Sequence, residues 1–353
     1  MTDLSFSQFS DQIQEHFAKG TFAEGLSLAS LYISEFPNEF PLINYWRMCL
    51  AARLDETVTA NKILESTLAS GIWYSEILLR QSPALEPLQG QEEFERLIDI
   101  SLQMQTADPI NAVPVLVVRP EEACGPEDEG CPAVIFLHAN QDTAQKNLEH
   151  WRSLPNQGWL VAMPQSSLAM WAGVYIWQDF ESAAKEIEEH YHKLTEQYSL
   201  DPERILLAGF SMGAEVALAM ILDGRIKAKG FVLLGPGGPF MDNLDEWSPL
   251  IEKSKGKDIR GVILMGLADE TIPQDNIRQL VKTLNENGIA CDLKTFPALE
   301  HEYPEDFEDV LKEALDFIFK LSLTNHHMTP DNHCNSTKRN TVETAEQQAK
   351  NPE

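Results

Sequence analysis

The sequence predicts an α/β fold: a mostly parallel sheet with helices on both faces, preceded by a small all-α domain. From about Val113, short apolar runs alternate with longer amphipathic stretches, as strands and helices do in a parallel sheet. The earlier segment repeats apolar residues at helical spacing and contains no convincing strand. We expect domains at residues 1–105 and 106–321, followed by a polar, disordered tail at 322–353.

The N-terminal segment is expected to form at least four helices. Apolar residues recur every three or four positions in the ranges 6–17, 22–33, 42–54 and 58–68. Adding 34 to Gly20 and Pro37 gives Leu54 and Gly71, which is the spacing of tetratricopeptide units. The segment therefore resembles a degenerate tetratricopeptide pair, and a helical cap on the next domain is the alternative.

The second domain is expected to contain seven strands and at least four helices. The strand ranges are 113–119, 133–138, 158–163, 204–209, 230–234, 261–266 and 290–296. The helix ranges are 178–198, 212–222, 274–287 and 304–321. The strand runs are nearly all apolar, which is typical of strands that helices cover on both faces.

The net charge argues against two classes of partner. The chain has 27 Lys and Arg against 55 Asp and Glu, a net charge of −28. Such a chain repels nucleic-acid phosphates and anionic lipid surfaces. No apolar run approaches the roughly 20 residues that span a bilayer, and the start has no pattern of a secretory signal. We expect no nucleic-acid partner and no membrane span.

The cysteines favour a reducing compartment. They are odd in number and scattered, which fits reduced thiols in a cytoplasmic protein better than a disulfide framework. Cys124 and Cys131 flank one acidic loop and can meet, although a shared loop is the simpler account. The five cysteines are Cys49, Cys124, Cys131, Cys291 and Cys334.

A candidate nucleophile lies between a predicted strand and a predicted helix. The motif is Gly209-Phe-Ser211-Met-Gly213. Glycines are needed on either side of the serine because the strand and helix backbones approach closely at such a turn. The turn exposes the hydroxyl at the carboxyl end of the sheet, beside a helix N-terminus that favours developing negative charge. A helix-capping serine is the alternative.

A serine hydroxyl needs a base, which is usually a histidine. His301 lies between the last predicted strand and the last predicted helix, in a loop at the same edge of the sheet. The other histidines after Ser211 fall in the predicted tail: His326, His327 and His333. Elimination and placement therefore select His301.

The acid that orients the histidine is expected after an earlier strand at this edge. Asp269 follows the predicted strand 261–266 and is our choice. Glu270 is the neighbouring rival, and Asp242 and Asp245 are alternatives after the previous strand.

An acyl-transfer site also needs donors for an oxyanion. The backbone N–H groups of Met212, after the nucleophile, and Asn140, in the loop after the strand 133–138, are the expected pair. Ala139 is close behind Asn140. We expect His138 to anchor this loop by hydrogen bonding.

Four motifs together carry a family resemblance. They are Leu137-His-Ala-Asn140, Gly209-Phe-Ser-Met-Gly213, Gly266-x-x-Asp269 and His301-x-Tyr-Pro304. The region 113–321 resembles the esterase branch of the α/β-hydrolase superfamily, near phospholipase/carboxylesterase, dienelactone-hydrolase and feruloyl-esterase-like enzymes. The resemblance implies a Ser–His–Asp triad, no metal and no organic cofactor. One departure is His138-Ala139, where such enzymes usually have His-Gly; alanine fits if its φ is negative or only slightly strained.

The aromatic residues Trp171, Tyr175 and Trp177 are candidates for substrate binding. They lie in the loop after the strand 158–163, which in this fold is near the active-site mouth. They can form an apolar wall for an acyl group, or they can pack the next helix onto the core.

The sequence therefore predicts a cytoplasmic serine hydrolase that cleaves a carboxylic ester, or a thioester, of a small molecule through an acyl-enzyme. One alternative is a peptidase or acyl-peptide hydrolase of the same fold. Another is a non-enzymatic protein that binds a partner, or itself, through residues 1–105.

Overall fold

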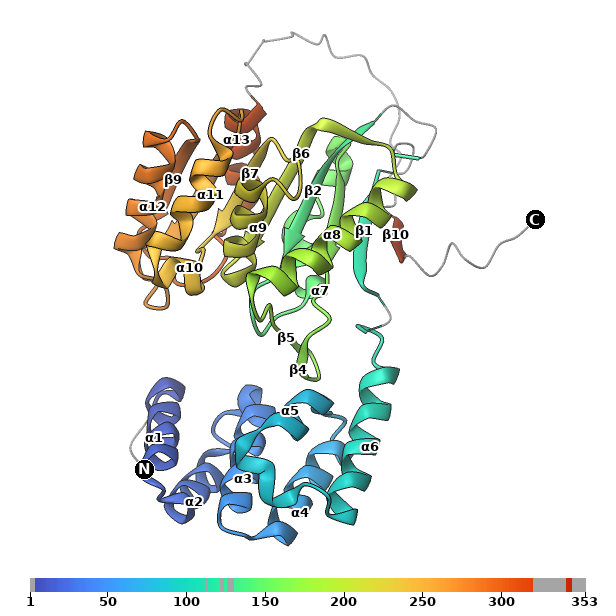
Figure 1. The fold of residues 1–353 in the computed structure, drawn as a ribbon, viewed down its shortest axis with the longest axis vertical. Helices are drawn as coiled ribbons and strands as arrows, with labels where there is room; N and C mark the ends of the chain where they lie inside the picture. Colours follow the sequence, from blue (N-terminus) through green and yellow to red (C-terminus); the bar gives the residue numbers. More distant parts are fainter. Residues whose placement is uncertain (1–3, 112, 121–123, 126–129, 320–340, 345–353) are drawn as a thin grey trace, which may run out of the picture. The chain divides into compact units, whose positions relative to one another are not determined.

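The computed structural model describes residues 4–111, 113–120, 124–125, 130–319 and 341–344. The chain divides into two compact units. Unit 1 is Met1–Ala112 together with Ala169–Val174, and unit 2 is Val113–Leu168 together with Tyr175–Glu353. Unit 1 consists mostly of helices, and unit 2 contains the large sheet (Figure 1).

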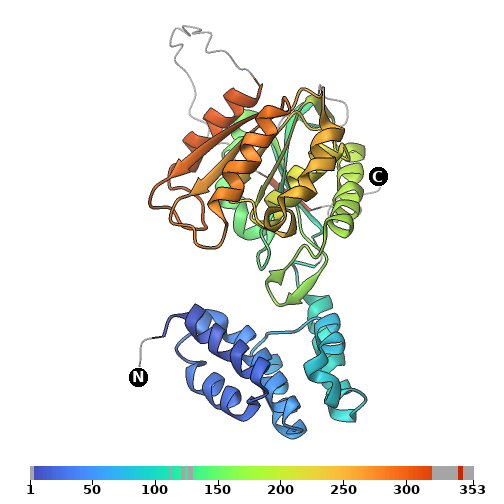
Figure 2. The same cartoon turned by 60° about the vertical axis from the view of Figure 1, so that its left-hand side comes forward.

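Unit 1 is built from helices that pack in sequence, each on the next, from α1 to α4 (Figure 2). The four predicted helices are confirmed as α1 to α4. The tetratricopeptide resemblance stays a prediction. The helices are α1 (Phe6–Lys19), α2 (Phe22–Tyr32), α3 (Phe40–Arg53), α4 (Thr57–Ala69), α5 (Glu76–Gln81) and α6 (Glu92–Ala107), with 3₁₀ turns at Pro37–Glu39 and Pro83–Leu88.

Local sequence accounts for the limits of the first helix. Ser5 and Gln8 form a capping box, in which each side chain bonds the backbone N–H of the other residue. Gly20, with φ 69°, ends the helix in the left-handed conformation that glycine adopts without strain. Between these ends, Phe9 and Ile13 are fully buried in the core of unit 1.

A short two-stranded arm also belongs mostly to unit 1. Its first strand is held by the backbone of Ser75, whose N–H donates to the Met170 carbonyl oxygen at 2.9 Å. The Trp171 ring lies edge-on to the Tyr74 ring, with the centroids 6.3 Å apart. The sequence predicted neither strand. The strands are β4 (Ala169–Trp171) and β5 (Val174–Tyr175).

Unit 2 is organised around one sheet with the strand order β10-β1-β3-β2-β6-β7-β8-β9. All neighbours from β3 to β9 run parallel, and β1 is antiparallel to β3. All seven predicted strands are present. The strands are β1 (Val115–Arg119), β2 (Cys131–Leu137), β3 (Leu160–Pro164), β6 (Leu200–Phe210), β7 (Gly230–Leu234), β8 (Arg260–Gly266) and β9 (Ala290–Phe296).

The strand β10 (Thr341–Thr344) was not expected, because it lies in the predicted disordered tail. It pairs antiparallel with β1, with Val118 opposite Val342. The polar tail pattern gave no sign of it, since edge pairing depends on a partner far away in the sequence. The remaining tail residues, including His326, His327 and His333, lie outside the described residues.

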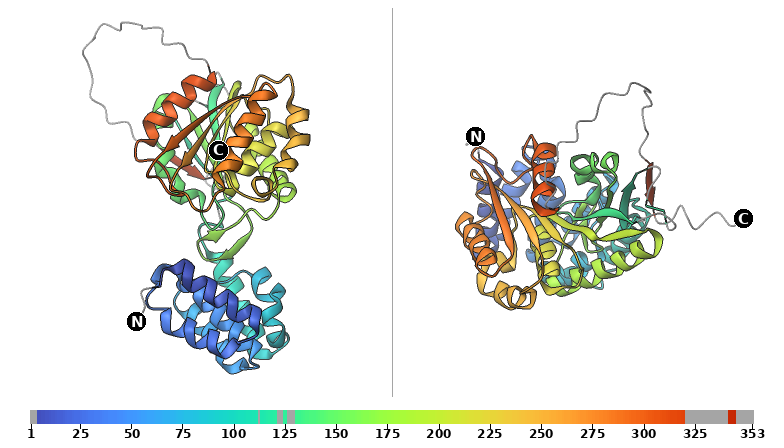
Figure 3. Two further views of the ribbon diagram at one scale, coloured as in Figure 1. Left: turned by 90° about the vertical axis from the view of Figure 1, so that its left-hand side faces the viewer. Right: turned by 90° about the horizontal axis from the view of Figure 1, so that it is seen from above.

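Helices cover both faces of the sheet, as the view from above shows (Figure 3). One hydrophobic cluster joins the sheet to α8, α9, α11 and α12, and the other joins it to α7 and α13. The helices are α7 (Ala144–Trp151), α8 (Phe180–Gln197), α9 (Met212–Asp223), α10 (Pro239–Asp242), α11 (Trp247–Ser254), α12 (Gln274–Glu286) and α13 (Phe307–Phe319), with 3₁₀ turns at Leu154–Gln157 and Leu244–Glu246.

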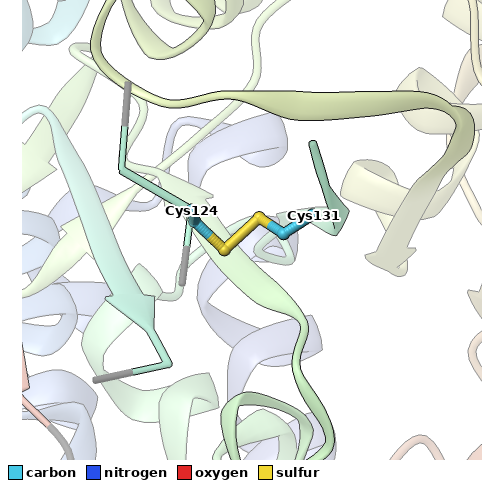
Figure 4. The surroundings of a disulfide bond; sticks show 2 residues. All are labelled: Cys124 and Cys131. Atoms are coloured by element: carbon cyan, nitrogen blue, oxygen red, sulfur yellow. A yellow bond between two sulfur atoms is a disulfide. The ribbon is translucent and has the colours of Figure 1, made fainter. Parts of the chain in front are cut away.

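The expectation of free thiols is wrong for one pair of cysteines. Cys124 and Cys131 form a disulfide, with the Cα atoms 5.3 Å apart (Figure 4). Both side chains are buried, and Cys131 begins β2. An odd number of cysteines does not exclude a disulfide, because a single pair at the right distance is enough to form one. Cys49 and Cys291 are free and buried.

In the part of the chain that the structure describes, no helix is both long enough and apolar enough to cross a membrane.

Candidate active site

Ser211 occupies a strained turn between β6 and α9. Its φ of 53° and ψ of −122° are rare for a residue with a side chain. Hydrogen bonds maintain this conformation: the Ser211 N–H donates to the Leu234 carbonyl oxygen at 2.9 Å, and the Ser211 carbonyl oxygen accepts from Ala214 and Glu215. Such over-determined strain is typical of a nucleophile held clear of the sheet.

The two glycines of the motif permit this turn. A Cβ atom at Gly209 would lie 2.4 Å from the Gly213 carbonyl oxygen. A Cβ atom at Gly213 would lie 2.3 Å from the carbonyl oxygens of Leu137 and His138. The first turn of α9 therefore lies directly against the loop that follows β2, and a side chain at either glycine would separate them.

Asp269 and His301 meet at the same edge of the sheet. The Nδ1 atom of His301 lies 2.7 Å from Oδ2 of Asp269. The other carboxylate oxygen of Asp269 accepts from the backbone N–H groups of Thr271 and Ile272, at 2.8 and 3.1 Å. Because a carboxylate accepts, His301 donates from Nδ1; in the neutral imidazole tautomer that does so, Nε2 is the nitrogen that can take a proton.

The rival acids do not occupy this position. The Asp269 side chain is buried, with 3% exposed, whereas Glu270, Asp242 and Asp245 are exposed. Within the described residues, Asp269 is the one carboxylate that bonds His301.

Close backbone contacts place the two loops that carry this pair. A Cβ atom at Gly266, the last residue of β8, would lie 2.3 Å from the Leu299 carbonyl oxygen in the loop of His301. A Cβ atom at Gly235, the residue after β7, would lie 3.1 Å from the His301 ring and 3.5 Å from Asp269 Oδ2. Nothing in the local sequence around Gly235 marks it as part of this site.

Phe210, the residue before Ser211, contacts His301. The Phe210 ring, directly before Ser211, lies 4.7 Å from the His301 ring between centroids. Among the described residues, His301 makes no hydrogen bond to Ser211. In unliganded enzymes this bond is often long and shortens when substrate binds.

The backbone N–H groups of the two expected oxyanion donors make no hydrogen bond within the described residues. One is Met212, the first residue of α9, and the other is Asn140 in the loop after β2. Ala139 does not have a positive φ, so alanine fits where relatives usually have glycine; Gln141 takes the left-handed conformation instead, with φ 64°. The Asn140 side chain accepts from the Trp177 N–H at 2.7 Å, which fixes the loop.

His138 anchors this loop from a fully buried position. Its Nδ1 lies 2.7 Å from the Ala139 carbonyl oxygen, and its Nε2 accepts from the Ser166 N–H at 3.1 Å. Burial lowers the pKa of His138 from 6.5 to about 4, so the ring is neutral at pH 7. A buried neutral histidine with both nitrogens occupied has a structural role.

Residues 122–322 match the model of the phospholipase/carboxylesterase family. The chain belongs to this family. The family supports ester hydrolysis, and the sheet order with its helices shows the α/β-hydrolase fold. A search of curated proteins finds no match.

Several solved structures are similar to this chain. An uncharacterized protein from Bacillus cereus ATCC 10987 is 26% identical, with a TM-score of 0.50, over 89% of this chain and 99% of that one. The coverage includes much of the helical unit as well as the hydrolase domain. Two other solved structures are less similar. An esterase from Thermogutta terrifontis is 14% identical, with a TM-score of 0.44, over 61% of this chain and 90% of that one. A phospholipase/carboxylesterase from Dyadobacter fermentans is 18% identical, with a TM-score of 0.44, over 57% of this chain and 96% of that one.

In this phospholipase/carboxylesterase family member, the three predicted substrate-binding aromatics are packed inside the protein. Trp171 lies in unit 1 against Tyr74. Tyr175 is fully buried, and Trp177 stacks on His138 while its indole N–H donates to the His138 carbonyl oxygen at 2.8 Å. These contacts fit the packing alternative, because buried rings that already have partners offer little surface to an acyl group.

Glu215 is a buried residue near the site that sequence reasoning missed. It is 3% exposed, lies four residues after Ser211 in α9, and accepts from the Met241 N–H at 2.8 Å. It thereby ties α9 to α10, and in the loop between β7 and α10 the Gly237 N–H donates to the Ser211 carbonyl oxygen. Desolvation raises the pKa of Glu215 from 4.5 to about 7. The sequence signal for a buried role was the single acidic residue within the apolar run Met212–Leu222.

The described residues hold no cluster of three or more histidine, cysteine, aspartate or glutamate side chains placed to bind a metal ion.

Proposed function

We propose that this protein is a serine esterase whose triad is Ser211, His301 and Asp269. The Asp269–His301 hydrogen bond carries the proposal, because it gives the histidine an unprotonated Nε2 at the sheet edge where Ser211 is held in strain. A packing role for His301 would need neither the buried carboxylate nor its two backbone donors.

In the first half-reaction, Ser211 Oγ forms a bond to the ester carbonyl carbon, and its proton moves to His301 Nε2. The N–H groups of Met212 and Asn140 stabilise the oxyanion. When the tetrahedral intermediate collapses, the carbon–oxygen bond of the leaving alcohol breaks and the alcohol takes the proton from Nε2. Asp269 stabilises the imidazolium in between and stays ionised. Water then repeats these steps and releases the acid.

Labelling with a fluorophosphonate probe tests the proposal. We expect covalent modification of Ser211 in the wild type, with none in Ser211→Ala or after heat denaturation. Turnover of p-nitrophenyl butyrate should fall to background in Ser211→Ala while the circular dichroism spectrum is unchanged. A folded wild type that takes up no label would refute the assignment, and so would full turnover by Ser211→Ala.

The bond that is cleaved needs a second experiment. Matched acyl esters, thioesters and aminoacyl amides of one acyl group separate an esterase or thioesterase from a peptidase. We expect the ester to give a higher kcat/KM than the amide, because an alcohol leaves more readily than an amine. A preference for the amide would favour the peptidase alternative.

The cytoplasmic location and a partner for residues 1–105 remain predictions. The Cys124–Cys131 disulfide counts against the cytoplasm, since such bonds persist mainly in oxidising compartments. A sedimentation measurement of the full chain tests self-association.

A further inference from the structure

A chain of hydrogen bonds joins the loop of His301 to the loop after β2. Tyr303, two residues after the proposed base, donates from its hydroxyl to Oδ1 of Asn147 at 2.8 Å. Asn147 lies on α7 and donates from Nδ2 to Oδ2 of Asp142 at 2.7 Å. Asp142 is two residues after Asn140, the proposed oxyanion donor. We call Tyr303, Asn147 and Asp142 the Tyr303 relay.

Each hydrogen bond of the relay has a defined direction. The Tyr303 hydroxyl also accepts from the indole N–H of Trp151 at 3.3 Å, so its own proton is directed toward Asn147. Burial raises the pKa of Tyr303 well above 10, which keeps the hydroxyl protonated. Asn147 is 2% exposed, and its Nδ2 also donates to the Thr143 carbonyl oxygen at 2.9 Å. The amide therefore has one orientation that satisfies all its partners.

The ring of Tyr303 is fixed as firmly as its hydroxyl. It stacks on the His150 ring, with centroids 3.7 Å apart and planes 4° from parallel. The Tyr303 and Phe210 rings meet edge to face, with their centroids 5.6 Å apart, and the centroids of the Phe210 and His301 rings are 4.7 Å apart. Tyr303 thus contacts the residue that supports both the base and the nucleophile, in addition to bonding α7.

The far end of the relay is tied to the oxyanion loop. Asp142 forms an isolated β-bridge with Tyr175, and the neighbouring Gln141 donates its N–H to the Tyr175 carbonyl oxygen at 2.7 Å. Asp142 is therefore held on both its backbone and its side chain. A shift of α7 would move Asp142 and the loop together.

We propose that the Tyr303 relay fixes the position of the loop that carries His301 relative to the loop after β2 that carries Asn140. Tyr303 is a positioning residue, since its hydroxyl reaches no reacting atom. The inference rests on the proposed esterase function. One hydrogen bond contributes little to the stability of the whole fold, whereas a displacement of about 1 Å in a catalytic group costs up to roughly 100-fold in rate. The relay therefore affects kcat more than it affects stability.

The test compares Tyr303→Phe with Tyr45→Phe in the full-length protein. Tyr45 is a matched control, because its hydroxyl donates to Ser82 at 2.8 Å within unit 1, whereas the proposed triad belongs to unit 2. Both variants should lose a few degrees of Tm. We expect kcat for p-nitrophenyl butyrate to fall at least tenfold in Tyr303→Phe with little change in KM, and to stay at the wild-type value in Tyr45→Phe. The rate of fluorophosphonate labelling should fall in parallel.

A double-mutant cycle separates the relay from independent packing effects. Asn147→Ala should also lower kcat, and the double variant with Tyr303→Phe should be no slower than the slower single variant. Additive losses would overturn the relay, as would wild-type kcat in Tyr303→Phe. If Asn147→Ala does not fold, the kcat of Tyr303→Phe decides alone. An inactive, unlabelled wild type would instead overturn the proposed function.

Discussion

The carboxylate of Asp269 lies 2.7 Å from Nδ1 of His301, although 32 residues separate them in the chain. Asp269 is buried, with 3% of its side chain exposed, while 23% of His301 is exposed. The pair therefore combines a shielded acceptor with a partly exposed imidazole. This arrangement orients the proposed base.

Replacing Asp269 with asparagine should retain the fold and lower activity. The asparagine amide can donate to Nδ1, which favours the tautomer with the proton on Nε2 and so blocks proton transfer from Ser211. We expect kcat to fall on the order of 10²- to 10⁴-fold, measured with p-nitrophenyl butyrate. Glu270→Gln is the matched control and should keep wild-type kcat, because Glu270 is exposed and does not bond His301. The reverse result would reassign the acid.

Gly235→Ala should disturb the Asp269–His301 pair. The new Cβ would lie 3.1 Å from the His301 ring, and φ at this position is 43°. Gly256→Ala is the control: its φ is 80°, but its Cβ would meet no atom within 4 Å. Backbone strain should cost each variant about 1–2 kcal/mol in the free energy of unfolding.

Only Gly235→Ala should lose activity, by tenfold or more in kcat. Urea unfolding and ester turnover, measured on the same samples, separate the two effects. Equal kcat in both glycine variants would show that the contact with His301 has no catalytic consequence.

Glu215 should make stability depend on pH. Its pKa is about 7 in the folded protein and 4.5 when unperturbed, so between these values the folded state holds a proton that the unfolded state has released. The free energy of unfolding contributed by this group therefore decreases as pH rises from about 4.5 to about 7. Glu215→Gln should show a shallower decrease over this window when unfolding is followed in urea. An identical pH dependence in both proteins would contradict the raised pKa.

The Cys124–Cys131 disulfide should stabilise the protein. The bond closes a loop with a sequence separation of 7, for which loss of unfolded-state entropy predicts about 2–3 kcal/mol. Dithiothreitol should lower the urea midpoint of the wild type and leave that of the double variant Cys124→Ala, Cys131→Ala unchanged. Peptide mapping after alkylation without reduction should recover the two cysteines in one linked peptide. Alkylation of both thiols in the unreduced wild type would exclude the bond.

The sequence alone was enough to predict the order of the main elements. Hydrophobic periodicity and β-branched runs are local properties, so the strands from β1 to β9 in the sheet and the helices α1 to α4 follow from short windows. The turn at Ser211 is local as well, because Gly209 and Gly213 mark a close approach of strand and helix. Family resemblance rested on the same short motifs, and the family match agrees with it.

The tertiary structure decided what depends on residues far apart in the chain. It brought Asp269 rather than Glu270 to His301, and it placed Trp171 against Tyr74 in unit 1. It also joined Tyr303 to Asn147 across 156 residues. No local pattern encodes these contacts, because they arise only when the packed sheet and its helices bring distant backbones together.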